Sequence, residues 1–390
     1  MSVSFHPPSR RILIRGVNWL GDAVMATPAL LRLRERFSDS HFTLLTPEKL
    51  ADLWKNHPAI DQTISFAPGE NVFAVAQKLR RGSGTPGDAR AARFDLALVL
   101  PNSPRSALEV WLAGIPRRIG YARPWRNFFL TQSVAPRADA VKMRKRSVAE
   151  VKKLVAENPE SRTPDLNIPQ SAHQIYEYLN LVAALGANPA PLAPQLAVTP
   201  DEMDAVKKKF GLEKISAPVL GLNPGAEYGP AKRWPVEKFI AAAGEIQQRT
   251  NCTWILFGGR GDLELAARIE AGTQNLKLKT QNLAGRTSLR ELMALLKLCR
   301  VLLTNDTGPM HVAAALGTPV VVPFGSTSPE LTAPGLPGDS RQHLLKSAVP
   351  CAPCFLRECP IDLRCLNGIS VERAVGAVLQ ALQQGAREPS

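Results

Sequence analysis

Three loops in this sequence carry residue types that can hold a phosphorylated ligand or move a proton. The first, Gly16-Val-Asn-Trp-Leu-Gly21-Asp22, joins a short apolar run to a stretch with helical periodicity. Its glycines permit a tight turn, and the backbone amides at a helix start attract negative charge. Such a position favours the ionised form of Asp22. We interpret Asp22 as a general base, with a plain helix cap as the alternative.

The second loop, residues 223–235, is rich in glycine and basic. It follows a predicted strand, begins with Asn223 and Gly225, and presents Lys232 and Arg233 before the next helix. A glycine-rich backbone with cationic side chains suits a diphosphate. We therefore predict that Asn223, Gly225 and Lys232 bind the phosphorylated ligand, with an ordinary surface loop as the alternative.

The third loop, Asn305-Asp-Thr-Gly-Pro-Met-His311, again lies between a predicted strand and a helix. Thr307 or Gly308 can cap that helix, and its free amides would point at a phosphate. Asp306 would repel a phosphate directly, so we expect it to orient Lys232 or a substrate hydroxyl. His311 is equally a core residue or a ligand contact.

Composition limits the class of protein. The 390 residues exceed the size of a usual single core, and 45% hydrophobic with 21% charged residues is ordinary globular composition. Six cysteines are too few for a disulfide scaffold, and no signal peptide is visible. The prolines and glycines of residues 307–329 exclude a membrane span there and favour a buried helix and strand. We expect a cytoplasmic protein.

A net charge of +14 calls for an anionic partner, either nucleic acid, a membrane surface or a phosphorylated substrate. Only 6% of residues are aromatic, and we find no basic–aromatic pattern typical of RNA binding, so we expect no nucleic-acid partner. The densest basic run is Arg137–Lys153. We predict that it docks an anionic acceptor, with a solvated helix face as the alternative; the residues assigned to docking are Lys142, Arg144, Lys145 and Arg146.

Short apolar runs alternate with helical patterns along the whole chain, which predicts parallel sheets covered by helices. Residues 185–200 hold four prolines and no charge, as a stiff linker does. We therefore predict an α/β protein with two Rossmann-like domains facing a central cleft, residues 1–184 and 201–390. In this prediction the last helix either stays with the second domain or packs back on the first.

Four cysteines lie within fifteen residues near the C-terminus: Cys351, Cys354, Cys359 and Cys365. The first spacing suits zinc, but no second such pair and no nearby histidine follows. We interpret the thiols as structural, with a metal site as the alternative. No Asp-x-Asp pair exists for a metal-held nucleotide, so no cofactor is expected.

Taken together, three stretches resemble glycosyltransferase family 9, the ADP-heptose:lipopolysaccharide heptosyltransferases. They are RILIRGVNWLGDAVMATPAL, GLNPGAEYGPAKRWPVEKF and LLTNDTGPMHVAAALGTPVVVPFGSTSPELTAP. The Asn-Trp-Leu-Gly-Asp form and the cysteine-rich tail are most similar to the members that add the second inner-core heptose.

The resemblance implies a GT-B fold and metal-independent transfer with inversion at the anomeric carbon of the heptose. It places Asp22 on the general base, Lys232 on the phosphate-binding lysine, and Asp306, Thr307 and Gly308 on the donor-binding motif. Asp262 matches an acidic ribose contact more loosely. The implied partners are ADP-heptose, a lipid A–core oligosaccharide acceptor and the cytoplasmic face of the inner membrane.

Two rival classes remain open on the sequence. Another GT-B nucleotide-sugar enzyme, such as an epimerase, accounts for the phosphate loops but not for a basic face. A nucleotide-sensing or nucleic-acid-binding protein is the alternative outside enzymes, and duplex or single-strand binding that falls steeply with salt would favour it.

Overall fold

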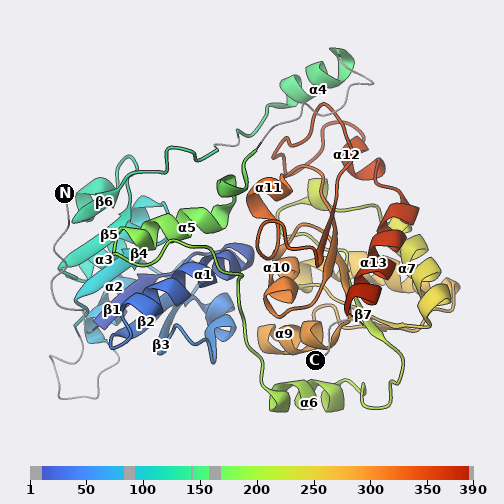
Figure 1. Ribbon diagram of the computed structural model, residues 1–390, viewed down its shortest axis with the longest axis horizontal. Coiled ribbons are helices and arrows are strands. Elements are labelled where there is room, and N and C mark those ends of the chain that lie inside the picture. Colours follow the sequence, from blue (N-terminus) through green and yellow to red (C-terminus); the bar gives the residue numbers. More distant parts are fainter. Residues whose placement is uncertain (1–10, 83–92, 142–143, 158–167, 386–390) are drawn as a thin grey trace. The chain divides into compact units, whose positions relative to one another are not determined.

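The computed structural model describes residues 11–82, 93–141, 144–157 and 168–385. The chain forms two compact units (Figure 1). Unit 1 comprises Met1–Ala140 and Gln174–Ala197, and unit 2 comprises Val141–His173 and Val198–Ser390. No helix of the described residues is both long enough and apolar enough to cross a bilayer.

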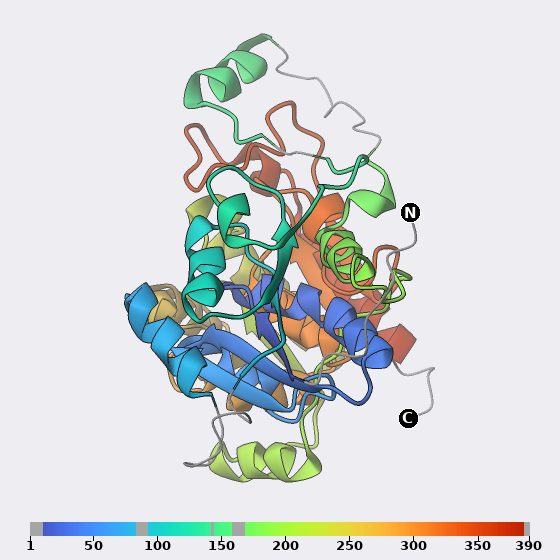
Figure 2. The same cartoon turned by 90° about the vertical axis from the view of Figure 1, so that its left-hand side faces the viewer.

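Unit 1 is built on a six-stranded sheet in which all neighbouring strands are parallel. In sheet order the strands are β3 (Gln62–Phe66), β2 (His41–Pro47), β1 (Arg11–Arg15), β4 (Leu96–Val99), β5 (Arg117–Tyr121) and β6 (Gln132–Val134). Helices α1 (Leu20–Arg36) and α5 (Gln174–Ala183) pack together, as do α2 (Val72–Arg81) and α3 (Pro104–Leu112). Figure 2 shows these two helix pairs on opposite sides of the strands. The 3₁₀ helices are η1 (Glu48–Trp54), η2 (Asn127–Phe129) and, in unit 2, η3 (Gln170–Ala172).

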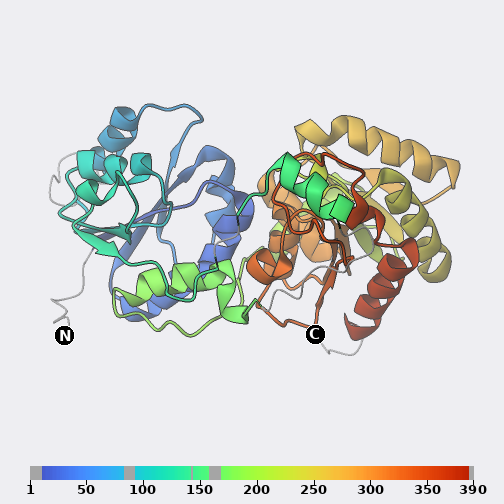
Figure 3. The same ribbon diagram turned by 90° about the horizontal axis from the view of Figure 1, so that it is seen from above.

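Unit 2 repeats this design with a second parallel sheet of six strands. In sheet order they are β12 (Gln342–Leu345), β11 (Val320–Pro323), β10 (Leu302–Thr304), β7 (Val219–Asn223), β8 (Thr253–Leu256) and β9 (Thr280–Asn282). Helix α7 (Val236–Thr250) packs against α8 (Leu263–Asn275) and α13 (Val371–Gly385), while α9 (Leu289–Leu298) contacts α6 (Pro200–Lys209) and α10 (Gly308–Ala315) (Figure 3). The remaining elements are α4 (Val148–Glu157), α11 (Pro329–Thr332), α12 (Arg364–Asn367), η4 (Pro230–Lys232) and η5 (Arg260–Asp262).

The central strands have the composition of a sheet covered on both faces. All four residues of β4 and all four of β11 are buried, and all of them are apolar. Such strands read as continuous apolar runs because helices cover both sides. The two observed sheets confirm the predicted α/β class with two Rossmann-like parallel-sheet domains.

Strand order reverses between β1 and β4 in unit 1 and between β7 and β10 in unit 2. At such a point the loops after the two strands leave toward opposite faces and open a space at the carboxyl edge. The loops at Gly16–Asp22, at 223–235 and at 305–311 all start at these strand ends. The fold therefore places the three predicted loops where α/β proteins bind ligands.

The domain division differs from the predicted one in two respects. Residues 141–173 belong to unit 2, although they precede the predicted linker, and most of that linker, residues 185–197, belongs to unit 1. The last helix, α13, packs on α7, β11 and β12 of unit 2, and its apolar stripe joins the core of that unit through Val375 and Val378. The short outer strands β6, β9 and β12 were not predicted, because their mixed polar residues carry no strand pattern.

Candidate functional site

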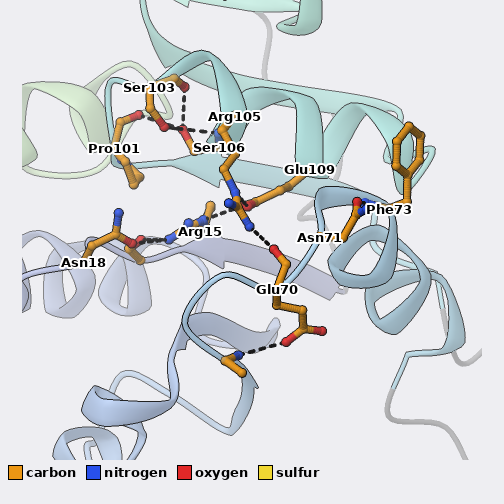
Figure 4. Close-up of polar contacts among 12 residues, drawn as sticks. Arg15, Asn18, Glu70, Asn71, Phe73, Pro101, Ser103, Arg105, Ser106 and Glu109 are labelled. Atoms are coloured by element: carbon orange, nitrogen blue, oxygen red, sulfur yellow. Dashed lines mark hydrogen bonds and ion pairs between the residues drawn. The ribbon is translucent and has the colours of Figure 1, made fainter.

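A buried ion pair holds the first loop of unit 1 (Figure 4). Arg15 ends β1, and its Nε donates to the Glu109 carboxylate of α3 at 2.8 Å; the two side chains are 3% and 0% exposed. The same guanidinium donates to the Gly16 carbonyl and, at 3.0 Å, to Oδ1 of Asn18. Arg105 holds the other oxygen of Glu109 at 3.0 Å. The pair thus ties the loop before α1 to a neighbouring helix.

Close packing also fixes the start of this loop. The Gly16 amide donates to the Leu45 carbonyl at 2.9 Å. A Cβ at position 16 would stand 3.2 Å from that carbonyl oxygen and 3.1 Å from the Leu44 side chain. Glycine is therefore required for this close approach of two chains.

Asp22 lies in the first turn of α1 and is half-buried. The N-cap residue is Trp19, whose side chain makes no capping hydrogen bond. Gln174 of α5 donates through Nε2 to Oδ1 of Asp22 at 3.1 Å and to the Tyr178 hydroxyl at 2.9 Å. Burial, and then the Asp22 charge, raise the pKa of Tyr178 far above its ordinary value. Tyr178 therefore stays protonated, and Asp22 is the group in this trio that can accept a proton.

Arg126 is a cation that the sequence did not reveal. It is fully buried over the carboxyl ends of β4 and β5, where a Cβ on Gly120 would stand 2.6 Å from its terminal nitrogen. One nitrogen donates to Asn102 at 3.2 Å, and the other two have no hydrogen-bond partner. Burial lowers its pKa to about 10, so the guanidinium remains charged at neutral pH. It gives this edge of unit 1 a positive potential.

In unit 2 the predicted cation and the predicted aspartate meet directly. Lys232 Nζ lies 2.7 Å from Oδ2 of Asp306, and both side chains are largely buried. The Thr327 hydroxyl after β11 donates to the same carboxylate oxygen. The Lys232 ammonium also lies 4.9 Å from the centre of the Tyr228 ring. Of the two roles expected for Asp306, this geometry fits the orientation of Lys232.

Asn305 joins the second and third loops. It accepts from the Trp234 amide at 2.9 Å and donates to the Pro224 carbonyl at 2.7 Å. Asn223 instead turns to β10, donating to the Thr304 hydroxyl at 3.0 Å. These buried bonds fix the backbone on both sides of Lys232. Asn223 therefore has a structural bond of its own, and its contact with a ligand stays a prediction.

Gly225 and Asp262 lie against each other at the ends of β7 and β8. A Cβ on Gly225 would stand 2.5 Å from the Asp262 carboxyl group, so a larger residue would require that carboxylate to move. Asp262 accepts from the Gly259 amide at 3.0 Å, and Arg233 lies 3.7 Å away. The predicted donor residues Gly225 and Asp262 are thus brought together, although they are far apart in sequence.

Helix α10 begins at Gly308 after Thr307, whose extended backbone forms the N-cap. The Thr307 side chain makes no capping bond, so its hydroxyl is not committed to its own helix. Since the first amides of a helix lack internal partners, they suit a phosphate beside Lys232.

His311, one turn into α10, is buried and its pKa is lowered to about 4 by burial, partly offset by the Asp306 charge. It is neutral at pH 7 and resembles a core residue more than a charged ligand contact.

Only part of the basic run lies where it was predicted. Lys142 lies outside the described residues. Arg144 pairs with Glu150 at 2.6 Å, and Lys145 is exposed. Arg146 donates to the Pro350 carbonyl and its amide to the Cys354 carbonyl, both within unit 2. Arg137 lies in unit 1 as predicted, but residues 144–153 of the run belong to unit 2, because the apolar side of α4 packs onto the cysteine-rich loop.

The four cysteines line one small cavity in unit 2, together with apolar side chains. Cys351, Cys354 and Cys365 are buried and Cys359 is partly exposed. Burial raises the pKa of Cys365 to about 12, so its thiol is neutral at pH 7. Within the residues that the structure describes, no three Cys, His, Asp or Glu side chains are arranged to hold a metal ion.

Some residues of both sites were missed from the sequence. Gln174 and Thr327 contact predicted residues but lie in other elements, and nothing in their local pattern marks them. Asn305 lies in the third predicted loop itself but was not singled out as a site residue. Arg126 and Glu109 were missed for a different reason. Each looks like an ordinary surface residue until burial is known.

Comparison with known proteins gives a consistent result. Residues 160–364 match the family model described as Glycosyltransferase family 9 (heptosyltransferase). Lipopolysaccharide heptosyltransferase 2 of Salmonella typhimurium is 30% identical over 83% of this chain and 85% of its own length. Lipooligosaccharide heptosyltransferase 2 of Haemophilus ducreyi is 31% identical over 83% of this chain and 86% of its own length. The solved structure of Escherichia coli ADP-heptose lps heptosyltransferase II matches with a TM-score of 0.73 and 26% identity, over 96% of this chain and 99% of that one.

Glu109→Ala is expected to destabilise the protein by about 3–5 kcal/mol, because Arg15 then stays buried without its carboxylate. Urea unfolding measures the change. Arg105→Ala is the matched control: that side chain is 48% exposed, so its loss should cost about 0–1 kcal/mol. Equal losses in the two variants would contradict the central place of the Arg15–Glu109 pair.

His311→Asn is expected to make the protein less sensitive to acid. The pKa of the folded His311 is about 4 against an ordinary 6.5, so between these values only the unfolded chain takes up the proton. Stability is therefore complete above about pH 6.5 and falls as pH decreases, by about 1.4 kcal/mol per pH unit for each such histidine. Between pH 7 and pH 4, the slope of the free energy of unfolding against pH should be lower in the variant by the contribution of one proton. His41→Asn, at a partly exposed site, is the control, and an unchanged slope for His311→Asn would refute the assignment.

Proposed function

Since the chain belongs to glycosyltransferase family 9, the heptosyltransferases, we propose that it moves L-glycero-D-manno-heptose from ADP-heptose to the inner core of lipopolysaccharide. The acceptor we propose is the first heptose, so that the product carries the second. Transfer inverts the anomeric carbon. The observation that carries the donor assignment is the Lys232–Asp306 pair beside the start of α10.

The donor side of the reaction is assigned to unit 2. Lys232 and the first backbone amides of α10 form a positively charged binding site for the diphosphate of ADP-heptose. Asp306 and Tyr228 hold the lysine, so its ammonium is positioned before the ligand arrives. Asp262 sits behind Gly225 as the acidic group for the ribose hydroxyls.

The chemical step follows from these positions. The acceptor hydroxyl gives its proton to the Asp22 carboxylate while its oxygen bonds to the anomeric carbon. The bond from that carbon to the phosphate oxygen breaks, and ADP leaves with the bonding electrons. Lys232 stabilises the charge that develops on the diphosphate. Gln174 holds the Asp22 oxygen through its amide, so the carboxylate keeps its orientation.

We propose that this reaction needs no divalent metal. The sequence contains no Asp-x-Asp pair to hold one at the nucleotide, and Lys232 with the helix amides supplies the positive charge instead. The enzyme acts on a lipid A–core acceptor at the cytoplasmic face of the inner membrane. The positive potential around Arg126 favours such an anionic acceptor near Asp22.

Asp22→Asn is expected to lower kcat by about 100- to 10,000-fold, because the amide cannot take the proton. Asn can still accept the Gln174 hydrogen bond, so the melting temperature and the Kd for ADP-heptose should hardly change. Transfer to a defined core acceptor measures kcat, and calorimetry measures the donor. Normal turnover of the folded variant would remove Asp22 from the mechanism.

Lys232→Ala is expected to lower kcat by about 100- to 1,000-fold and to weaken ADP-heptose binding, because the cation at the leaving group is lost. The change leaves Asp306 buried without its cation, so Lys232→Met with Asp306→Asn serves as the control for folding. Magnesium should not rescue either variant. Loss of wild-type activity in EDTA would contradict the metal-free step, and conversion of ADP-heptose without acceptor would favour an epimerase.

A further inference from the structure

Aromatic side chains gather on the surface of unit 1 around the end of α3 and the η2 turn. The Trp111 ring lies 5.6 Å from Phe129 and 6.4 Å from Phe128, and these two phenylalanines are 5.5 Å apart. Phe128 is 80% exposed and Trp111 is 41% exposed. Trp125, in the turn directly before η2, is 89% exposed. Such large apolar groups in contact with water mark an interaction site rather than a core.

Arginines from two elements, α2 and β5, bond to the backbone beside these rings. The Arg80 guanidinium of α2 donates to the Leu112 carbonyl at 2.5 Å, next to Trp111. Arg118 of β5 donates to the Phe129 carbonyl at 2.7 Å, and its neighbour Arg117 is exposed. We call this set the aromatic–arginine surface: Arg80, Trp111, Arg117, Arg118, Trp125, Phe128 and Phe129.

Among the described residues, no acidic side chain pairs with Arg80, Arg117 or Arg118. Residues 96–138 contain six arginines and one acidic residue, Glu109, which is 0% exposed and paired with Arg15 and Arg105. Arg126 is buried and Arg137 pairs with Asp139, so neither adds unpaired charge to the surface. The surface therefore presents positive charge beside exposed indole and phenyl rings. Its charge is complementary to a polyanionic partner.

We propose that the aromatic–arginine surface docks unit 1 on an anionic lipid bilayer. Indole rings partition into the headgroup region because one end of the ring is apolar and the other can donate a hydrogen bond, and phenyl rings bury at the acyl boundary. Guanidinium groups pair with lipid phosphates, and basic side chains beside apolar ones are typical of proteins that lie on a membrane. This inference rests on the proposed function for its reason: the unit that carries Asp22 must reach a lipid-linked acceptor.

The predicted docking run is the weaker candidate for this contact. Arg144 is paired with Glu150 and Lys153 lies 3.7 Å from Glu157, so part of its charge is neutralised. Helix α4 also turns its apolar residue Val151 into unit 2. The run, residues 137–153, contains no aromatic residue. It serves here as the charge control.

Sedimentation of the full chain with vesicles tests the proposal. The wild type should bind phosphatidylcholine vesicles that contain phosphatidylglycerol and bind poorly to phosphatidylcholine alone. Trp125→Asn with Phe128→Ser should lower the partition coefficient by about tenfold or more. Asn suits position 125 because Trp125 has a φ of 63°, which Asn tolerates. Arg80→Gln with Arg117→Gln should remove the preference for the anionic lipid.

Two matched controls should bind like the wild type. Leu263→Ser with Leu276→Ser removes exposed apolar residues of unit 2, 52% and 51% exposed, and Lys145→Gln with Lys152→Gln and Lys153→Gln removes charge from the run. The melting temperatures of all variants report folding. Wild-type binding by the surface variants, or no binding by the wild type, would overturn the proposal. Salt-sensitive binding of single-stranded nucleic acid that displaces the vesicles would overturn it as well.

Kinetics separate this proposal from the proposed function. With a deacylated, water-soluble core acceptor, the surface variants should keep the kcat and KM of the wild type. With the acceptor embedded in vesicles, their KM should rise about tenfold or more. Vesicle binding without any heptose transfer would refute the proposed function alone. Equal KM values on embedded acceptor would refute the docking surface alone.

Discussion

The reversal of strand order beside β1 and beside β7 is the constraint on which both sites depend. Parallel strands end at one edge of a sheet, and each reversal sends the two following loops to opposite faces. Helix starts then surround a space with their unpaired amides. Because this space follows from the strand order alone, the proposed reaction adds to it only a base in unit 1 and a cation in unit 2.

Each unit fixes its reactive group through buried polar contacts from other elements. In unit 1, Arg15 and Glu109 hold the loop and Gln174 holds Asp22. In unit 2, Asp306 and Asn305 do the same for Lys232. A buried ion pair contributes little net stability, but breaking it is costly, so such contacts favour one loop conformation over others. The two units therefore use the same kind of buried polar contact, made by different residues.

The two functions proposed for positive charge, donor binding and lipid docking, use cations in different environments. Lys232 is buried and paired, which suits a defined leaving group. Arg80 and Arg117 are exposed and Arg118 is half-buried, and among the described residues none of them pairs with an acidic side chain, which suits a surface of variable composition. Salt screens the interactions of solvent-exposed charges beyond about 10 Å, and those of buried pairs much less. The proposed lipid docking is therefore expected to weaken with ionic strength more than the proposed donor binding.

The sequence by itself determined the fold class, most central strands and the three loops, because apolar periodicity and glycine-rich turns are local properties. It singled out Asp22, Lys232 and Asp306 for the same reason: each lies in the segment that leads from a buried strand into the next helix. Only the tertiary structure decided the assignment of residues 141–173 to unit 2 and the partners Gln174, Glu109 and Thr327. Burial and pairing of such residues depend on elements distant in sequence, so no local pattern records them. The aromatic–arginine surface is also a product of packing, since α2, α3, β5 and η2 supply its members from separate stretches of the chain.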